Sequence, residues 1–205
     1  MNVGRTMGMK KMIGGALALA LAAAATPALA GWKVVPANAP TEVAKSRMKA
    51  TPAVSWNRQT KRPSPKAETW TLDGAALNEV SFFGGVGEGE PLYKERDKKG
   101  KPLPRFKAGM LPTDVVTLFE ATQRITTESS LFAVDKVEPA TLGGHRGVRF
   151  EYHYSLSGDQ LNRRGEAVAA IVGGKLYLVS FAAPDIHYFD RDVAQFRAIV
   201  RSVAI

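Results

Sequence analysis

The sequence predicts an α+β fold in which an antiparallel sheet has two main helices packed on it. Runs of alternating apolar and polar residues predict several strands, and turn-forming Asp-Gly and Gly-Gly pairs between them predict hairpins. Strands joined by hairpins exclude an all-parallel sheet. Two other segments repeat apolar residues at helical spacing, one in the middle of the chain and one at its end. Two such amphipathic helices can cover one face of the sheet.

The segment from residue 31 to residue 66 has an irregular composition, with five prolines among many basic residues. Trp32–Val35 and Val54–Trp56 each predict a short strand, whereas the prolines argue against a long helix. We interpret this segment as an extended, proline- and base-rich arm that joins the edge of the sheet.

Two strands are predicted between residues 68 and 86. Trp70 and Leu72 alternate with polar neighbours, and Asp73-Gly74 marks a turn. The apolar run Val80–Phe83 predicts the second strand, which ends at a pair of glycines. A long excursion, Gly87–Pro112, follows it, and connections of this length inside a compact domain are usually functional or mobile.

The first helix is expected to begin at Thr113, which is a good N-cap, with Asp114 in its first turn. Its apolar positions continue at helical spacing as far as Ile125. The last helix is expected to begin at Asp190 as N-cap, and Asp192 complements its positive end.

Four strands are predicted between the two helices. Leu131–Val137 is followed by Val148–Leu156, where strict alternation over nine residues indicates one buried and one wet face. Glu166–Val172 is apolar on both faces, as a central strand should be. Gly173-Gly174 then predicts a two-residue hairpin into Lys175–Phe181.

The C-terminal part of the chain, roughly Leu131–Ile205, resembles the PsbP/Mog1-like proteins. The resemblance rests on a meander that ends in Gly174–Phe181, a short loop and a final helix that contains Phe196–Ser202. It implies an α/β/α sandwich and a mostly noncatalytic accessory or binding role. The chain departs from bacterial members with a lipoprotein cysteine because it has no cysteine. No functional residue of the family transfers to a position in this sequence.

Residues 1–30 predict a secretory signal peptide. A basic start precedes the apolar run Met12–Ala25, and Ala28-Leu29-Ala30 offers small residues for cleavage after Ala30. The alternative is an uncleaved membrane anchor, but the run is shorter than the roughly 20 residues that span a bilayer. We therefore expect a periplasmic or secreted protein with no transmembrane segment after cleavage. Residues 67–205 then form a single α+β domain after the arm of residues 31–66.

The composition favours anionic partners. Without the predicted signal peptide, 25 basic residues face 19 acidic ones, a net charge of +6. In an exported protein the expected partners are anionic envelope components or another envelope protein, and not nucleic acid. The alternative is a soluble surface with a mild positive bias.

No enzyme motif is present: the sequence lacks a nucleophile elbow, a zinc-binding HExxH helix and a phosphate-binding loop. The segment 185–192 places His187 among three aspartates, a set that can hold a divalent metal, but helix capping by the aspartates is the alternative. We therefore predict no catalytic residue, no metal site and no cofactor.

The basic loop, Tyr93–Lys107, is the candidate binding segment. A hairpin-like arm of this kind can lay cationic side chains on an anionic surface. A second basic group lies at residues 58–66, and the alternative for the loop is a solvated segment that its like charges keep extended. The candidate residues are Lys94, Arg96, Lys98, Lys99, Lys101, Arg105 and Lys107.

The sequence therefore predicts an exported, noncatalytic accessory or binding protein of the bacterial cell envelope. The alternative is a periplasmic hydrolase with an unrecognised active site. That alternative requires a concave pocket in which polar groups with shifted pKa values converge, such as a cleft that gathers Glu151 and His153 with further carboxylates.

Overall fold

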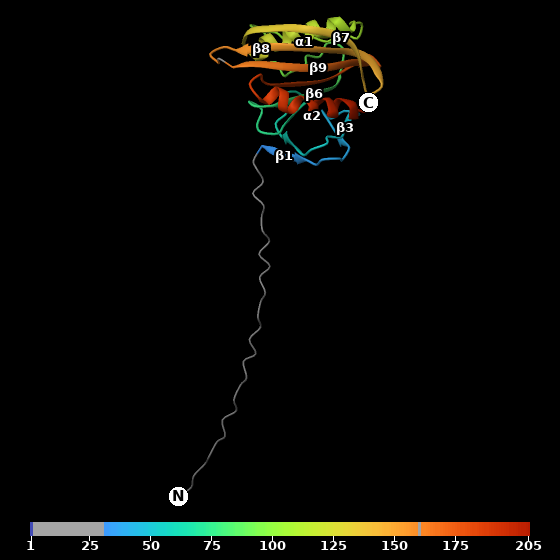
Figure 1. The fold of residues 1–205 in the computed structure, drawn as a ribbon. Helices are drawn as coiled ribbons and strands as arrows, with labels where there is room; N and C mark the ends of the chain where they lie inside the picture. The colour runs from blue at the N-terminus through green and yellow to red at the C-terminus, as the bar shows by residue number, and fades with distance from the viewer. Residues whose placement is uncertain (2–30, 160) are drawn as a thin grey trace.

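The computed structural model describes residues 1, 31–159 and 161–205, and within them the chain forms an eight-stranded antiparallel sheet (Figure 1). The predicted α+β fold class is confirmed. A separate two-stranded hairpin consists of β2 (Thr41–Glu42) and β3 (Lys49–Ala50). The strands of the large sheet lie in the order β1 (Trp32–Val35), β4 (Trp56–Gln59), β5 (Ala67–Thr71), β6 (Glu79–Val86), β10 (Lys175–Pro184), β9 (Asn162–Val172), β8 (His145–Leu156) and β7 (Ser129–Leu142).

The two helices, α1 (Pro112–Thr126) and α2 (Tyr188–Ser202), lie on opposite faces of the sheet instead of covering one. Strand β10 shows the reason, because it is apolar on both faces. Leu176 and Leu178 belong to the buried cluster that includes α1, whereas Tyr177 and Val179 belong to the cluster that includes α2. A sheet with two apolar faces needs a cover on each. The α/β/α arrangement that the resemblance implies is therefore present.

The predicted strands are all present, with corrected ends. β8 keeps the predicted alternation as far as Tyr152, since Val148, Phe150 and Tyr152 are buried and the residues between them are partly exposed, whereas residues 153–156 are all partly exposed. The strand expected at Val54–Trp56 instead begins at Trp56, where pairing with β1 starts. β7 is longer than predicted because its pairing with β8 continues to the Gly143-Gly144 turn.

Both helix starts differ from the predictions. α1 begins at Pro112, which suits the first helical position because it has no N–H to satisfy. Asp114 then accepts a hydrogen bond from the Leu111 N–H at 2.8 Å, so Thr113 is not the N-cap. α2 begins at Tyr188, two residues before Asp190, whose carboxylate pairs with Arg164 at 3.3 Å instead of capping the helix.

Residues 31–66 lie along the β1 edge of the sheet and contribute to the core. Their anchor is Glu68 on β5, whose carboxylate is fully buried. It accepts hydrogen bonds from the Ala44 N–H at 3.2 Å and from Trp70 Nε1 at 2.9 Å. It also pairs with Arg62 at 3.0 Å and with Arg58 at 3.5 Å. Arg58 and Arg62, from the second basic group of the sequence, therefore hold this segment against the sheet.

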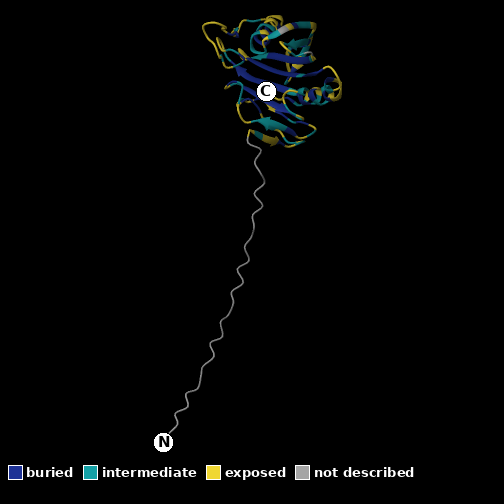
Figure 2. Ribbon diagram, turned by 90° about the vertical axis from the view of Figure 1, so that its left-hand side faces the viewer, coloured by how far each residue is buried: buried dark blue, intermediate teal, exposed yellow. Residues whose placement is uncertain are grey.

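Burial follows the two-layered core, with the central strands buried and the loops at their ends exposed (Figure 2). The predicted signal peptide falls on residues that, apart from the first, lie outside the described part of the chain. In the described ranges, neither helix combines the length and the hydropathy needed to span a bilayer.

Candidate ligand-binding cavity

A row of three hydroxyl side chains crosses the α1 face of the sheet. Thr69 on β5 lies opposite Ser81 on β6, and Ser81 lies opposite Ser180 on β10. Neighbouring strands are about 4.8 Å apart, so the hydroxyl groups follow one another at that interval. All three side chains are buried, and all three line one cavity. We call Thr69, Ser81 and Ser180 the hydroxyl row.

Small residues beside the hydroxyl row make room for the cavity. The next register line runs from Glu79 through Ala182 and Gly165 to Tyr152. A Cβ atom at Gly165 would lie 2.0 Å from Cζ of Tyr152, so the tyrosine ring lies directly over the glycine. The Tyr152 hydroxyl donates to the Phe181 carbonyl at 3.1 Å, which fixes the ring as one wall.

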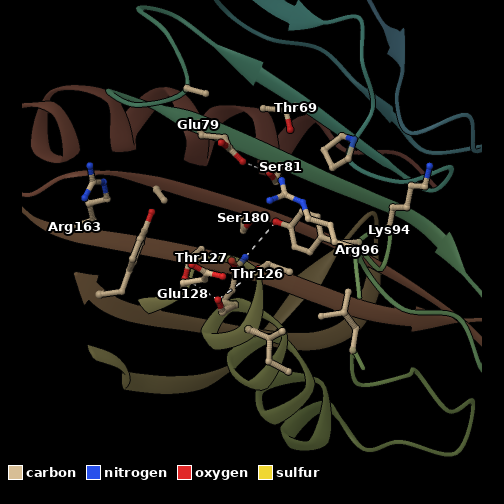
Figure 3. A pocket seen from close by; sticks show the side chains of 18 of the residues that line it. Thr69, Glu79, Ser81, Lys94, Arg96, Thr126, Thr127, Glu128, Arg163 and Ser180 are labelled. Carbon is tan, nitrogen blue, oxygen red and sulfur yellow. Dashed lines mark hydrogen bonds between the residues drawn. The ribbon is translucent and has the colours of Figure 1, made fainter. Parts of the chain in front are cut away.

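The roof comes from the basic loop and from the C-terminal end of α1 (Figure 3). Backbone hydrogen bonds between Gly89 and Phe106, and between Phe106 and Glu90, close the loop at its base. Leu92 and Phe106 are fully buried and hold it against the core. The enclosed volume is about 540 Å³, within the range of about 300–1,000 Å³ typical of small-molecule sites.

Polar side chains converge in the cavity from the basic loop, from α1 and from β6. Tyr93 of the loop accepts a hydrogen bond from Gln123 of α1 at 3.2 Å, and Ser81 donates to the Glu79 carboxylate at 2.6 Å. Burial raises the pKa of Glu79, and the bond from Ser81 offsets this only in part. Burial also raises the pKa of Tyr93 and raises that of Tyr154 to about 12. These groups therefore favour their uncharged forms.

The seven candidate residues of the basic loop are all exposed, but the structure divides them between different places. Lys94, Arg96 and Lys101 line the cavity. Arg105 and Lys107 line a separate hollow beside the first half of α1. The remaining two, Lys98 and Lys99, line neither hollow.

The basic side chains at the cavity differ in their partners. Lys101 pairs with Glu128 at 3.3 Å, and Arg163 pairs with Asp159 at 2.7 Å. Across residues 31–159 and 161–205, Lys94 and Arg96 form no ion pair. Figure 3 shows the Arg96 side chain reaching inward toward Ser81, whereas Lys94 points outward. The guanidinium of Arg96 is therefore available to a ligand.

The histidine-containing candidates lie away from this cavity. His153 pairs with Asp135 at 2.7 Å, and Glu151 accepts from Arg149 at 2.7 Å, both on the α2 face. Asp185 and Asp190 near His187 both pair with Arg164 at 3.3 Å. In the described ranges, no cluster of three or more His, Cys, Asp or Glu side chains is arranged to hold a metal ion.

Sequence reasoning missed the hydroxyl row and Glu79. A signal was available, because Phe83 lies on the same face of β6 as Glu79 and Ser81, so an apolar residue predicts that this face is covered as well. Ser180 likewise interrupts an otherwise apolar strand. Polar residues at positions that the alternation predicts to be buried often mark a site.

Comparisons with known proteins find similarity to solved structures alone. No family model matches the chain, and no curated protein matches its sequence. The solution structure of cyanobacterial PsbP (CyanoP) from Synechocystis sp. PCC 6803 is 16% identical, covers 85% of this chain and 82% of its own, and has a TM-score of 0.42. The crystal structure of LpqN, involved in cell envelope biogenesis of Mycobacterium tuberculosis, is 14% identical, with coverages of 84% and 90% and a TM-score of 0.30. PsbP belongs to the family that the sequence resembles, but neither likeness carries a function or a residue role to this chain.

Proposed function

We propose that this chain is an exported, noncatalytic accessory or binding protein of the bacterial cell envelope, and that it holds a small ligand in the cavity beneath the basic loop. The observation that carries the proposal is the cavity itself. Its floor is the buried hydroxyl row, and its roof contributes Tyr93, Gln123 and Arg96. Concave pockets of this volume, in which a few polar groups converge, are the usual place for a small-molecule site.

Export is supported by the sequence of residues 1–30, whose order of basic, apolar and small residues is that of a secretory signal. The net positive charge of the remaining chain supports an anionic ligand or partner through long-range attraction. The exposed basic side chains of the loop extend this attraction to the mouth of the cavity.

The test uses the full chain expressed in a bacterial host and recovered from the periplasmic fraction. Native mass spectrometry should detect a bound small molecule in the parent protein. Ala182→Leu should remove it, because a leucine at this position projects into the cavity beside Glu79. Ala194→Leu, at an exposed position on α2, is the matched control and should keep the ligand. Equal ligand occupancy in both variants would contradict the proposal.

A hydrolase is the second candidate function, because Ser81 donates to a carboxylate whose pKa is raised by burial. A carboxylate in that position can act as a general base for a hydroxyl nucleophile. This hypothesis predicts turnover of p-nitrophenyl acetate that both Ser81→Ala and Glu79→Gln abolish. A parent protein with no turnover above the buffer rate removes this candidate.

A further inference from the structure

We propose that the ligand is a small sugar that carries one acidic group, a carboxylate or a phosphate, with this group bound to Arg96 and its hydroxyl groups bound along the hydroxyl row. The inference rests on the proposed function and names the chemical class of its ligand.

The floor of the cavity selects against an aliphatic ligand. Of the three buried hydroxyl groups of the row, Ser81 already donates to Glu79. Thr69 makes no side-chain hydrogen bond within the described ranges, and an alkyl chain above it would leave it without a partner. A buried hydroxyl without a partner costs on the order of 1–3 kcal/mol. A hydrocarbon ligand would therefore bear this cost at Thr69.

The same floor suits a polyol. A hydroxyl group can both donate and accept, so Thr69 can pair with a ligand hydroxyl in either orientation, and Ser81, whose proton goes to Glu79, can still accept. Tyr93 and Gln123 add further hydrogen-bonding atoms from the roof, and the interval of about 4.8 Å between strands spreads the partners across the ligand. The volume of about 540 Å³ is sufficient for one or two sugar rings.

The distribution of charge around the cavity favours a ligand that carries an acidic group. Arg163 and Lys101 are paired with carboxylates of the protein, whereas Arg96 has no ion-pair partner in the described ranges and reaches inward (Figure 3). A guanidinium binds a carboxylate or a phosphate through two parallel hydrogen bonds.

Burial raises the pKa of Glu79, the carboxyl group on the floor, and so favours its uncharged form. Asp97 and Glu128 line the cavity from the loop and the end of α1, and Glu128 is paired with Lys101. An acidic group at Arg96 therefore meets a guanidinium above a floor whose carboxyl group favours the uncharged form.

Isothermal titration calorimetry with the periplasmic protein tests the inference, with glucuronate, glucose 6-phosphate and glucose as probes. We expect one of the two acidic sugars to bind at least tenfold more tightly than glucose, and the better of the two identifies the acidic group. Glucose that binds as tightly as both acidic sugars, or no binding of any probe, would overturn the inference.

Variants locate the contact. Arg96→Gln should weaken binding of the better acidic sugar at least tenfold, whereas Lys98→Gln, which removes the same charge from a residue outside the cavity, should change it less than twofold. Ser180→Ala should also weaken binding, and equal melting temperatures would show that these variants fold. Equal affinity of Arg96→Gln and the parent would overturn the inference while leaving the cavity as a binding site. Undiminished binding by Ala182→Leu would instead contradict the proposed function.

Discussion

Removal of the buried carboxylate of Glu68 should destabilise the whole sheet edge. Glu68→Ala leaves Arg62, Trp70 Nε1 and the Ala44 N–H without their shared acceptor. The loss of one partner from a buried ion pair costs about 3–5 kcal/mol. Because the Arg58 and Arg62 side chains remain 30% and 25% exposed, they recover some hydration. We therefore expect the free energy of unfolding to fall by about 3 kcal/mol, near the lower end of this range.

For a chain of this size, each kcal/mol corresponds to about 2–4 °C in melting temperature, so Glu68→Ala should melt about 6–12 °C below the parent. Differential scanning calorimetry and urea unfolding measure the two quantities. The control is Glu120→Ala, which breaks the surface pair with Arg124 on α1 and should cost about 0.5 kcal/mol.

The effect should reach the cavity, because the anchored segment also holds the basic loop. Ser64 donates to the Leu92 carbonyl at 2.9 Å, and the Lys94 N–H donates to the Pro63 carbonyl at 3.1 Å. Glu68→Ala should therefore lower ligand affinity as well as stability. A melting temperature equal to that of Glu120→Ala would refute the assignment of Glu68 as the anchor.

Three further predictions concern the wall, the α2 face and the basic loop. Gly165→Ala should lower the free energy of unfolding in urea by about 1–3 kcal/mol because its Cβ would displace the Tyr152 ring. The control Gly109→Ala, which has open space around it, should leave stability nearly unchanged. Equal losses in the two variants would contradict the assignment of Tyr152 as a fixed cavity wall. Burial alone raises the pKa of Glu166, but hydrogen bonds from Arg149 and Arg197 outweigh it and lower that pKa. The stabilisation that ionised Glu166 gives to the folded state is therefore fully present above the ordinary pKa and is lost as the pH falls through the lowered value. Glu166→Gln should flatten the fall in the free energy of unfolding below about pH 4.5. An unchanged pH profile of stability in this variant would argue against the role of Glu166. Replacement of all three lysines at positions 98, 99 and 101 by serine should reduce co-sedimentation with anionic vesicles at low salt and leave the melting temperature nearly unchanged, whereas equal sedimentation would exclude the loop as the vesicle contact.

The sequence was sufficient for the elements whose signals are local. The strand at Val148–Leu156 and the Gly173-Gly174 turn each depend on neighbouring residues, and both are present, with the alternation in burial kept from Val148 to Tyr152. The helix starts were wrong by one or more residues because competing groups decide them. Asp114 bonds to the Leu111 N–H, and Asp190 pairs with Arg164, inside a helix that already begins at Tyr188.

The site depends on contacts that the sequence does not encode locally. Thr69, Ser81 and Ser180 meet only because β10 pairs with β6 and β6 with β5, across a separation of about a hundred residues. Arg96 was among the predicted binding residues, but the excess of positive charge could not separate it from Lys98. That distinction depends on how the basic loop folds back over the sheet.

One titration tests the central claim that the cavity beneath the basic loop binds a small molecule. In ¹⁵N–¹H correlation spectra of the periplasmic protein, the acidic sugar that binds best should shift the amide signals of Ser81, Ser180 and Arg96 in a saturable manner. The signals of His153 and Ala194, on the α2 face, should remain in place. Shifts confined to the α2 face, or distributed evenly over exposed lysines, would contradict the claim.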